Sequence, residues 1–233
     1  CLAITCFLRK GIKMSGDAIN PYKLYLKPWL PRMPDVGNPR KADCIIVQAF
    51  GRNDFPNKEL YRAREIFTKS GKNDLEAVKA LWNRGFNPGR PNIELAEQCQ
   101  FLIREYGKPA LVQWEILPSF DRGWYLEHWK YVIGLWPSSK PGEQFNTRDV
   151  CLSAQREMKL NSWKVPMIIS HERQSVRAFL VARKIFGVEP VVVNDFTVDS
   201  LDGDSVQWKT TSRLMFTPWE LLARVHHRMH KWC

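Results

Sequence analysis

Four short apolar runs, separated by segments with helical periodicity, constrain this chain more than any other feature of its sequence. A run that is apolar on both faces is typical of a strand buried inside a parallel sheet. Helical segments between such runs are typical of βαβ units, which place their helices on the faces of that sheet. We therefore predict an α/β fold: a Rossmann-like, three-layer αβα domain with a mostly parallel sheet of four to five strands. Its strands are expected near residues 44–49, 110–116, 166–170 and 190–193.

The segments between the apolar runs repeat apolar residues at the three- and four-residue spacing of amphipathic helices. Asn92 is placed to cap one of these helices, because a polar side chain there can accept from free backbone N–H groups. The aromatic-rich segment 119–136 indicates core or lid packing rather than a platform for stacking bases. Helices are expected over residues 57–69, 74–84, 92–106, 147–160, 172–186 and 217–231.

The charge of the chain is unevenly distributed. Residues 1–41 hold eight Lys and Arg against two Asp and Glu, which is +6 of the total net charge of +11. Five prolines between residues 20 and 40 disfavour a regular helix there. We therefore expect an extended, weakly structured basic arm over 1–40 and one α/β domain over 41–233. Because most of the excess charge lies on the arm, nucleic-acid binding is not favoured, and it would have to weaken steeply with salt.

Six scattered cysteines without a C-x-x-C pair argue against a zinc ribbon and a disulfide scaffold. No stretch reaches the roughly 18 uninterrupted apolar residues of a membrane-spanning helix. These features predict a cytoplasmic protein without a transmembrane segment. His226, His227 and His230 have helical spacing but no accompanying carboxylate or cysteine, so they predict surface histidines and no metal site. The chain also lacks the glycine-rich fingerprints that bind phosphate or dinucleotides.

Polar residues follow the apolar runs, where parallel sheets of this class bind their ligands. Gly51 and Arg52 come after the first run, Glu115 closes the second, and His171 follows the third. A Glu115–His171 pair across adjacent strand ends would be suited to acid–base catalysis. The alternatives are a histidine satisfied by a backbone carbonyl, and a glutamate paired with an arginine.

Arg173 and Arg177 are four residues apart on one predicted helix, which places them on the same side of its first turns. Together with the free N–H groups there they form a candidate anion site, which Arg52 could close from the neighbouring loop. The alternative for these arginines is a solvated helix face. Asn146 and Thr147 begin another helix and are candidates to orient a ligand, although a capping role alone would explain them.

Six short segments follow one another along the chain: ADCIIVQAFG, PNIELAEQ, QWEI, FNTRDV, IISHERQSVRA and WELLARVHH. Their order and spacing resemble the YdcF/SanA/ElyC family, whose members have a Rossmann-like α/β fold and no settled reaction. The resemblance spans about residues 40–231. Mapped onto this sequence, it implies that Gly51, Arg52, Glu115, Asn146, Thr147, His171 and Arg177 are the signature polar positions.

One position departs from the family pattern. Members often have a second histidine three residues before the arginine, and this chain has Gln174 there. Glutamine can hydrogen-bond a ligand but cannot carry a proton at neutral pH, so the sequence leaves open whether the protein is an enzyme. The resemblance implies an anionic or nucleotide-type small ligand, with S-adenosylmethionine as one possibility. It implies, as the alternative, a non-catalytic cell-envelope-associated interaction protein of the SanA/ElyC type.

Overall fold

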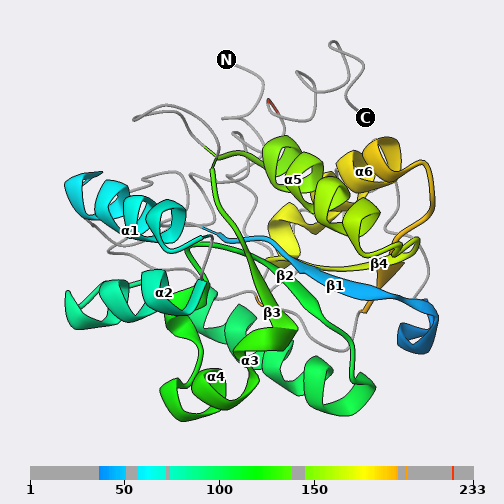
Figure 1. Cartoon of the computed structure of the whole chain (residues 1–233). Helices are drawn as coiled ribbons and strands as arrows, with labels where there is room; N and C mark the ends of the chain where they lie inside the picture. The colour runs from blue at the N-terminus through cyan, green and yellow to red at the C-terminus, as the bar shows by residue number, and fades with distance from the viewer. Residues whose placement is uncertain are drawn as a thin grey trace, which may run out of the picture. The chain divides into compact units, whose positions relative to one another are not determined.

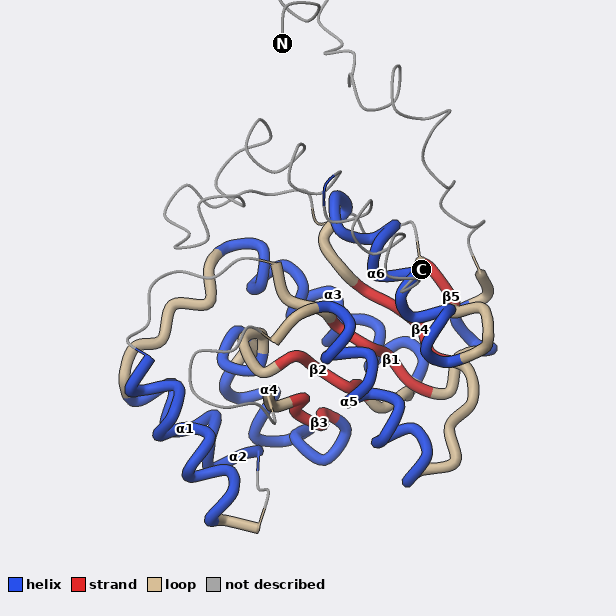
Figure 2. The backbone as a smooth tube through the Cα atoms, turned by 90° about the horizontal axis from the view of Figure 1, so that it is seen from above, coloured by secondary structure: helices blue, strands red, loops and turns tan. Residues whose placement is uncertain are grey.

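The computed structural model describes residues 37–50, 57–71, 74–137 and 145–193, together with Val198 and Leu222. Its centre is a five-stranded sheet in the order β3-β2-β1-β4-β5, and every neighbouring pair is parallel (Figures 1 and 2). This confirms the predicted α/β class, the Rossmann-like fold and the parallel arrangement of the four apolar runs. The strands are β1 (Cys44–Val47), β2 (Ala110–Gln113), β3 (Val132–Leu135), β4 (Pro166–Ile169) and β5 (Val191–Val192).

Strand β3 lies at one edge of the sheet, inside the aromatic segment that the sequence did not predict as a strand. Among the described strands it pairs only with β2, in the register Val112 with Gly134. Only Val132 and Leu135 of its four residues are fully buried, whereas the central strands β1 and β2 are buried at every position. A short, half-buried edge strand lacks the continuous apolar signal by which the other strands were identified.

Helices α5 (Thr147–Leu160) and α6 (Glu172–Phe186) cover one face of the sheet (Figure 1). Their small and apolar side chains form a core with the residues of the strands that point to this face. Both helices have the residue ranges that the sequence predicted. The members of this core include Cys44, Ile46, Leu111, Val150, Cys151, Ala154, Ala178 and Val181.

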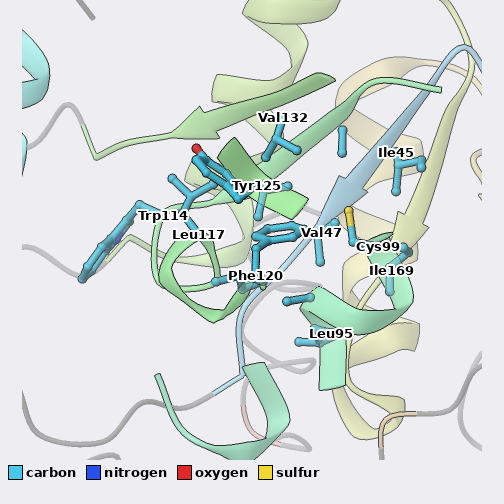
Figure 3. Close-up of a cluster of buried hydrophobic side chains, with 14 of the residues drawn as sticks. Ile45, Val47, Leu95, Cys99, Trp114, Leu117, Phe120, Tyr125, Val132 and Ile169 are labelled. Atoms are coloured by element: carbon cyan, nitrogen blue, oxygen red, sulfur yellow. The ribbon is translucent and has the colours of Figure 1, made fainter. Parts of the chain in front are cut away.

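The other face is covered by α1 (Asn57–Lys69), α2 (Asp74–Asn83), α3 (Arg90–Tyr106) and α4 (Arg122–His128). Aromatic side chains from 119–136 fill this larger core, so the segment packs in the interior, as its composition indicated (Figure 3). Phe120, for example, stacks on Trp124 with ring centroids 5.6 Å apart. The cluster drawn in Figure 3 combines strand residues such as Ile45 and Val47 with Leu95, Phe120 and Tyr125 from the covering layer.

The start of α3 differs from the sequence prediction. The helix begins at Arg90 after Gly89, whose φ of 83° is left-handed, and Asn92 is not its N-cap. Asn92 instead lies buried in the first turn, where its oxygen accepts from the Phe50 N–H at 3.0 Å and its amide donates to the Pro88 carbonyl at 2.7 Å. The Asn92 side chain therefore holds the segment that follows β1 and does not cap its own helix.

Several predictions fall on residues outside the described part. These are the arm up to residue 36, the loop 51–56 and the helix over 217–231 with its three histidines, of which only Leu222 is described. Gly37, the first residue described, donates its N–H to the Val192 carbonyl of the edge strand β5 at 3.1 Å. Among the helices that are described, none is long and apolar enough to cross a membrane.

Candidate functional site

The strand order reverses between β1 and β4, and the candidate site lies at this boundary. From β1 the chain runs to helices on one face of the sheet, and from β4 it runs to α6 on the other face. Two neighbouring strands whose connections diverge in this way leave a crevice beyond their carboxyl ends. The residues that reach this edge first are Gln48, Ala49 and Phe50 after β1, and Ser170 and His171 after β4.

His171 and Phe50 stack face to face at this boundary. Their ring centroids are 3.6 Å apart, the rings are inclined by only 9°, and His171 is fully buried. The His171 carbonyl accepts from the Gln174 N–H at 2.9 Å, which sets the start of α6. The stack covers one face of the imidazole ring. The fold thus places His171 where the sequence predicted it, against an aromatic partner that the sequence did not predict.

A buried polar network joins three elements at the same boundary. The Gln174 amide of α6 donates to the Gln48 oxygen at 3.3 Å and to the Thr147 hydroxyl at 3.4 Å. The Gln48 amide donates to the Cys151 sulfur at 3.4 Å, and burial raises the pKa of this thiol to about 12, so it stays protonated. Gln48, Thr147 and Gln174 are each at most 7% exposed. Thr147 and Gln174, which the sequence predicted to bind a ligand, therefore lie together with Gln48, which the sequence did not single out.

A second glutamine, Gln113, ends β2 and reaches across to the neighbouring strand. Its side-chain oxygen accepts from the Ala49 N–H at 3.0 Å. Gln48 and Gln113 occupy equivalent positions, because β1 and β2 pair Val47 with Val112 immediately before them. A glutamine as the first polar residue of an otherwise apolar run, in CIIVQ and ALVQ, is the sequence signal that could have identified both.

Glu115 lies in the turn after β2 and is only 7% exposed. The sequence allows a Glu115–His171 pair across adjacent strand ends as well as a Glu115–arginine pair, and the strand order shows that the two strand ends are not adjacent. Strand β1 lies between β2 and β4, so the ends of these two strands are two interstrand spacings apart, about 10 Å. Glu115 and His171 thus lie on opposite sides of β1, and an acid–base pair formed by them would have to act on a ligand that spans the end of this strand.

Asn146 and Thr147 follow each other at the start of α5, but they lie in different environments. The exposed Asn146 caps the helix, since its oxygen accepts from the N–H groups of Arg148 at 2.9 Å and Asp149 at 3.2 Å. The Asp149 carboxylate accepts from the Asn146 N–H at 3.3 Å and completes a capping box. Capping therefore accounts for the Asn146 oxygen, whereas the Thr147 hydroxyl points into the buried network.

The predicted anion site is described only in part. Arg177 is half-buried on α6, while Gly51, Arg52 and the side chain of Arg173 lie outside the described residues. Two N–H groups of the first turn of α6 already donate to backbone carbonyls: Glu172 to Val198 at 2.8 Å and Gln174 to His171 at 2.9 Å. The first turn of α6 thus offers an anion fewer N–H groups than the sequence suggested. An anion bound there would depend more on the arginine side chains.

Within the described ranges, no group of three or more His, Cys, Asp or Glu side chains is arranged to hold a metal ion. No family model matches the chain, and no curated protein or solved structure matches it. What the comparisons and the structure establish together is therefore the fold, an α/β domain with a five-stranded parallel sheet of Rossmann-like order.

Proposed function

We propose that this chain is a YdcF-like α/β domain that binds, and acts on or senses, an anionic or nucleotide-type small molecule at the carboxyl ends of β1 and β4. The buried network of Gln48, Thr147 and Gln174 is the observation that carries the proposal. Burying three neutral polar side chains at one point costs free energy unless they are hydrogen-bonded. Here they bond to one another at the boundary where the strand order reverses, which is where folds of this class bind ligands.

In this proposal the network forms the floor of the crevice and two groups above it contact the ligand. Arg177, one helical turn beyond Gln174 on α6, supplies a planar cation that can bind an anion with two hydrogen bonds. His171, fixed by its stack on Phe50, is proposed as the group that donates or accepts a proton there. Arg52 and Arg173 are proposed to add positive charge, and Glu115 would contact the ligand from the β2 side.

A ligand screen by thermal shift tests the proposal. The panel contains adenine and guanine nucleotides, inorganic phosphate and pyrophosphate, S-adenosylmethionine and S-adenosylhomocysteine. A ligand at about a hundred times its dissociation constant stabilises the folded state by roughly 2.7 kcal/mol, which raises the melting temperature by several degrees. A panel in which no compound shifts the melting temperature would contradict a small-molecule role. It would favour the non-catalytic, envelope-associated alternative.

A further inference from the structure

Asp74, the first residue of α2, is a buried carboxylate outside the candidate site. It is 9% exposed and joins the helix to the end of strand β3. One oxygen accepts from the Gly134 N–H at 2.6 Å, and the other accepts from the Trp136 indole N–H at 2.6 Å. The Gly134 N–H belongs to the open edge of the sheet, where no further strand pairs with it among the described residues.

Neither donor to Asp74 carries a charge, and within the described part of the chain no Lys, Arg or His forms an ion pair with it. A carboxylate that is removed from water without a cationic partner takes up a proton more readily than one in solvent. Burial accordingly raises the pKa of Asp74 to about 6, although its two hydrogen bonds oppose the shift.

Two other titratable groups act on this carboxylate. The negative charge of Glu157, on α5, also raises the pKa of Asp74. The Tyr125 hydroxyl, on α4, is fully buried and has no hydrogen-bond partner among the described residues; burial, and to a smaller extent the charge of Asp74, raise the pKa of that hydroxyl. Strand β3 and the 3-10 helix η4 (Leu117–Ser119) contain no titratable side chain. The described charged side chains of α1 lie at or near the surface; they are Arg62, Arg64, Glu65 and Lys69.

The Asp74 bonds fix an aromatic group that reaches the carboxyl edge of the sheet. The Trp136 ring stacks on Phe67 of α1 with centroids 5.0 Å apart and lies 6.1 Å from Trp114. Trp114 directly follows Gln113 at the end of β2. One carboxylate thus connects α2, the edge strand and the turn after β2.

We propose that Asp74 is a pH-sensitive latch on strand β3: the protonated carboxyl group stays buried against the Gly134 N–H and the Trp136 indole, and loss of its proton loosens these contacts. The step is the transfer of one proton from the carboxyl group to solvent. Water solvates a carboxylate better than the buried site does, so deprotonation favours the state in which the contacts are open. The latch is closed at pH 5 and below and opens as the pH rises from 5 to 7. This inference does not depend on the proposed ligand site.

NMR of the full chain between pH 4.5 and 8 tests the latch. The Asp74 carboxyl carbon, the Gly134 amide and the Trp136 indole N–H are expected to titrate together with one midpoint near 6. Hydrogen exchange at the two N–H groups, corrected for the intrinsic rate, should be about tenfold less protected at pH 7.5 than at pH 5.

Asp74→Asn should abolish the titration at both N–H groups, while Asp121→Asn, at the exposed cap of α4, should leave it intact. The Asp74 carboxyl carbon is followed in the wild-type protein, so the test does not depend on a variant that folds. A carboxyl carbon with a midpoint below 4.5 would overturn the proposal. N–H resonances that titrate unchanged in Asp74→Asn would overturn it as well.

Discussion

At the scale of single residues, Gly134 leaves almost no room for a side chain. A Cβ atom there would lie 2.5 Å from both the Asp74 carboxylate and the Trp136 indole nitrogen, and 2.9 Å from a Leu117 methyl group. Gly134→Ala should therefore force these groups apart and lower the free energy of unfolding by about 1–3 kcal/mol. Urea denaturation at pH 7 measures this change.

Gly123→Ala is the matched control, because a Cβ atom there meets only the Asp121 carboxylate, at 3.4 Å, and the residue lies in α4. Alanine has the higher helix propensity, so this variant should be neutral or more stable by up to about 1 kcal/mol. Equal effects of the two substitutions would contradict the packing described around Gly134.

Asp74 predicts an unusual pH dependence of stability. Its pKa is raised to about 6 in the folded protein, against about 3.9 in the unfolded chain. The unfolded chain therefore gives up this proton at lower pH than the folded protein, and stability falls as the pH rises from about 4 to 6. The expected loss from this residue is on the order of 3 kcal/mol. Urea unfolding of the wild type and of Asp74→Asn gives the free energy of unfolding at each pH in this range. The contribution of Asp74 is the difference between the two proteins in how this free energy changes with pH.

Asp43 should show the opposite behaviour and serves as an internal comparison. Hydrogen bonds from the backbone N–H groups of Val165 and Lys164 lower the pKa of its carboxyl group. Its contribution to stability is therefore present above the unfolded pKa and is lost as the pH falls through the folded one. If Asp74→Asn left the pH dependence between 4 and 6 unchanged, the assignment of this dependence to Asp74 would be wrong.

At the scale of elements, the turn after β1 depends on a side chain of α3. Asn92 satisfies the buried Phe50 N–H and the Pro88 carbonyl, and Phe50 in turn carries the stack on His171. Asn92→Ala leaves both backbone groups without this partner and should cost about 2–4 kcal/mol in unfolding free energy. Chemical denaturation gives this value, and the NMR resonances of the His171 ring should shift as the stack loosens.

Asn161→Ala removes a side-chain hydrogen bond of similar length, 2.9 Å to the Glu157 carbonyl, at an exposed helix end. Water replaces that bond, so the variant should stay within about 0.5 kcal/mol of the wild type. If the two asparagine substitutions had the same effect, Asn92 would not have the anchoring role described above.

The elements that could be predicted from sequence are those whose signals are local. Helix α5 was placed correctly because Asn146 and Asp149 form a capping box before an amphipathic stretch, and the central strands because they are apolar on both faces. Strand β3 was missed because an edge strand is only half buried. In the site, the contacts of Gln48 and Phe50 depend on residues more than 40 positions away, and no local pattern specifies such partners.

At the scale of the whole molecule, the central claim is that the boundary between β1 and β4 binds an anionic small molecule through Arg177. Calorimetric titration tests it with the compound that gives the largest thermal shift. Arg177→Ala should weaken binding by about 1.5–3 kcal/mol, roughly 10- to 150-fold, which is the usual contribution of a charged hydrogen bond. Lysine at this position should restore only part of the affinity, because it cannot donate two parallel hydrogen bonds.

Arg183→Ala is the matched control, since Arg183 lies in the last turn of the same helix and contacts the Phe179 ring at 5.8 Å. It removes the same charge at the end of α6 away from the strand carboxyl ends and should leave the dissociation constant unchanged. We expect a large loss of ligand affinity for Arg177→Ala and no loss of affinity for Arg183→Ala. Equal affinity of the wild type and Arg177→Ala would contradict this expectation, and so would an equal loss in both variants.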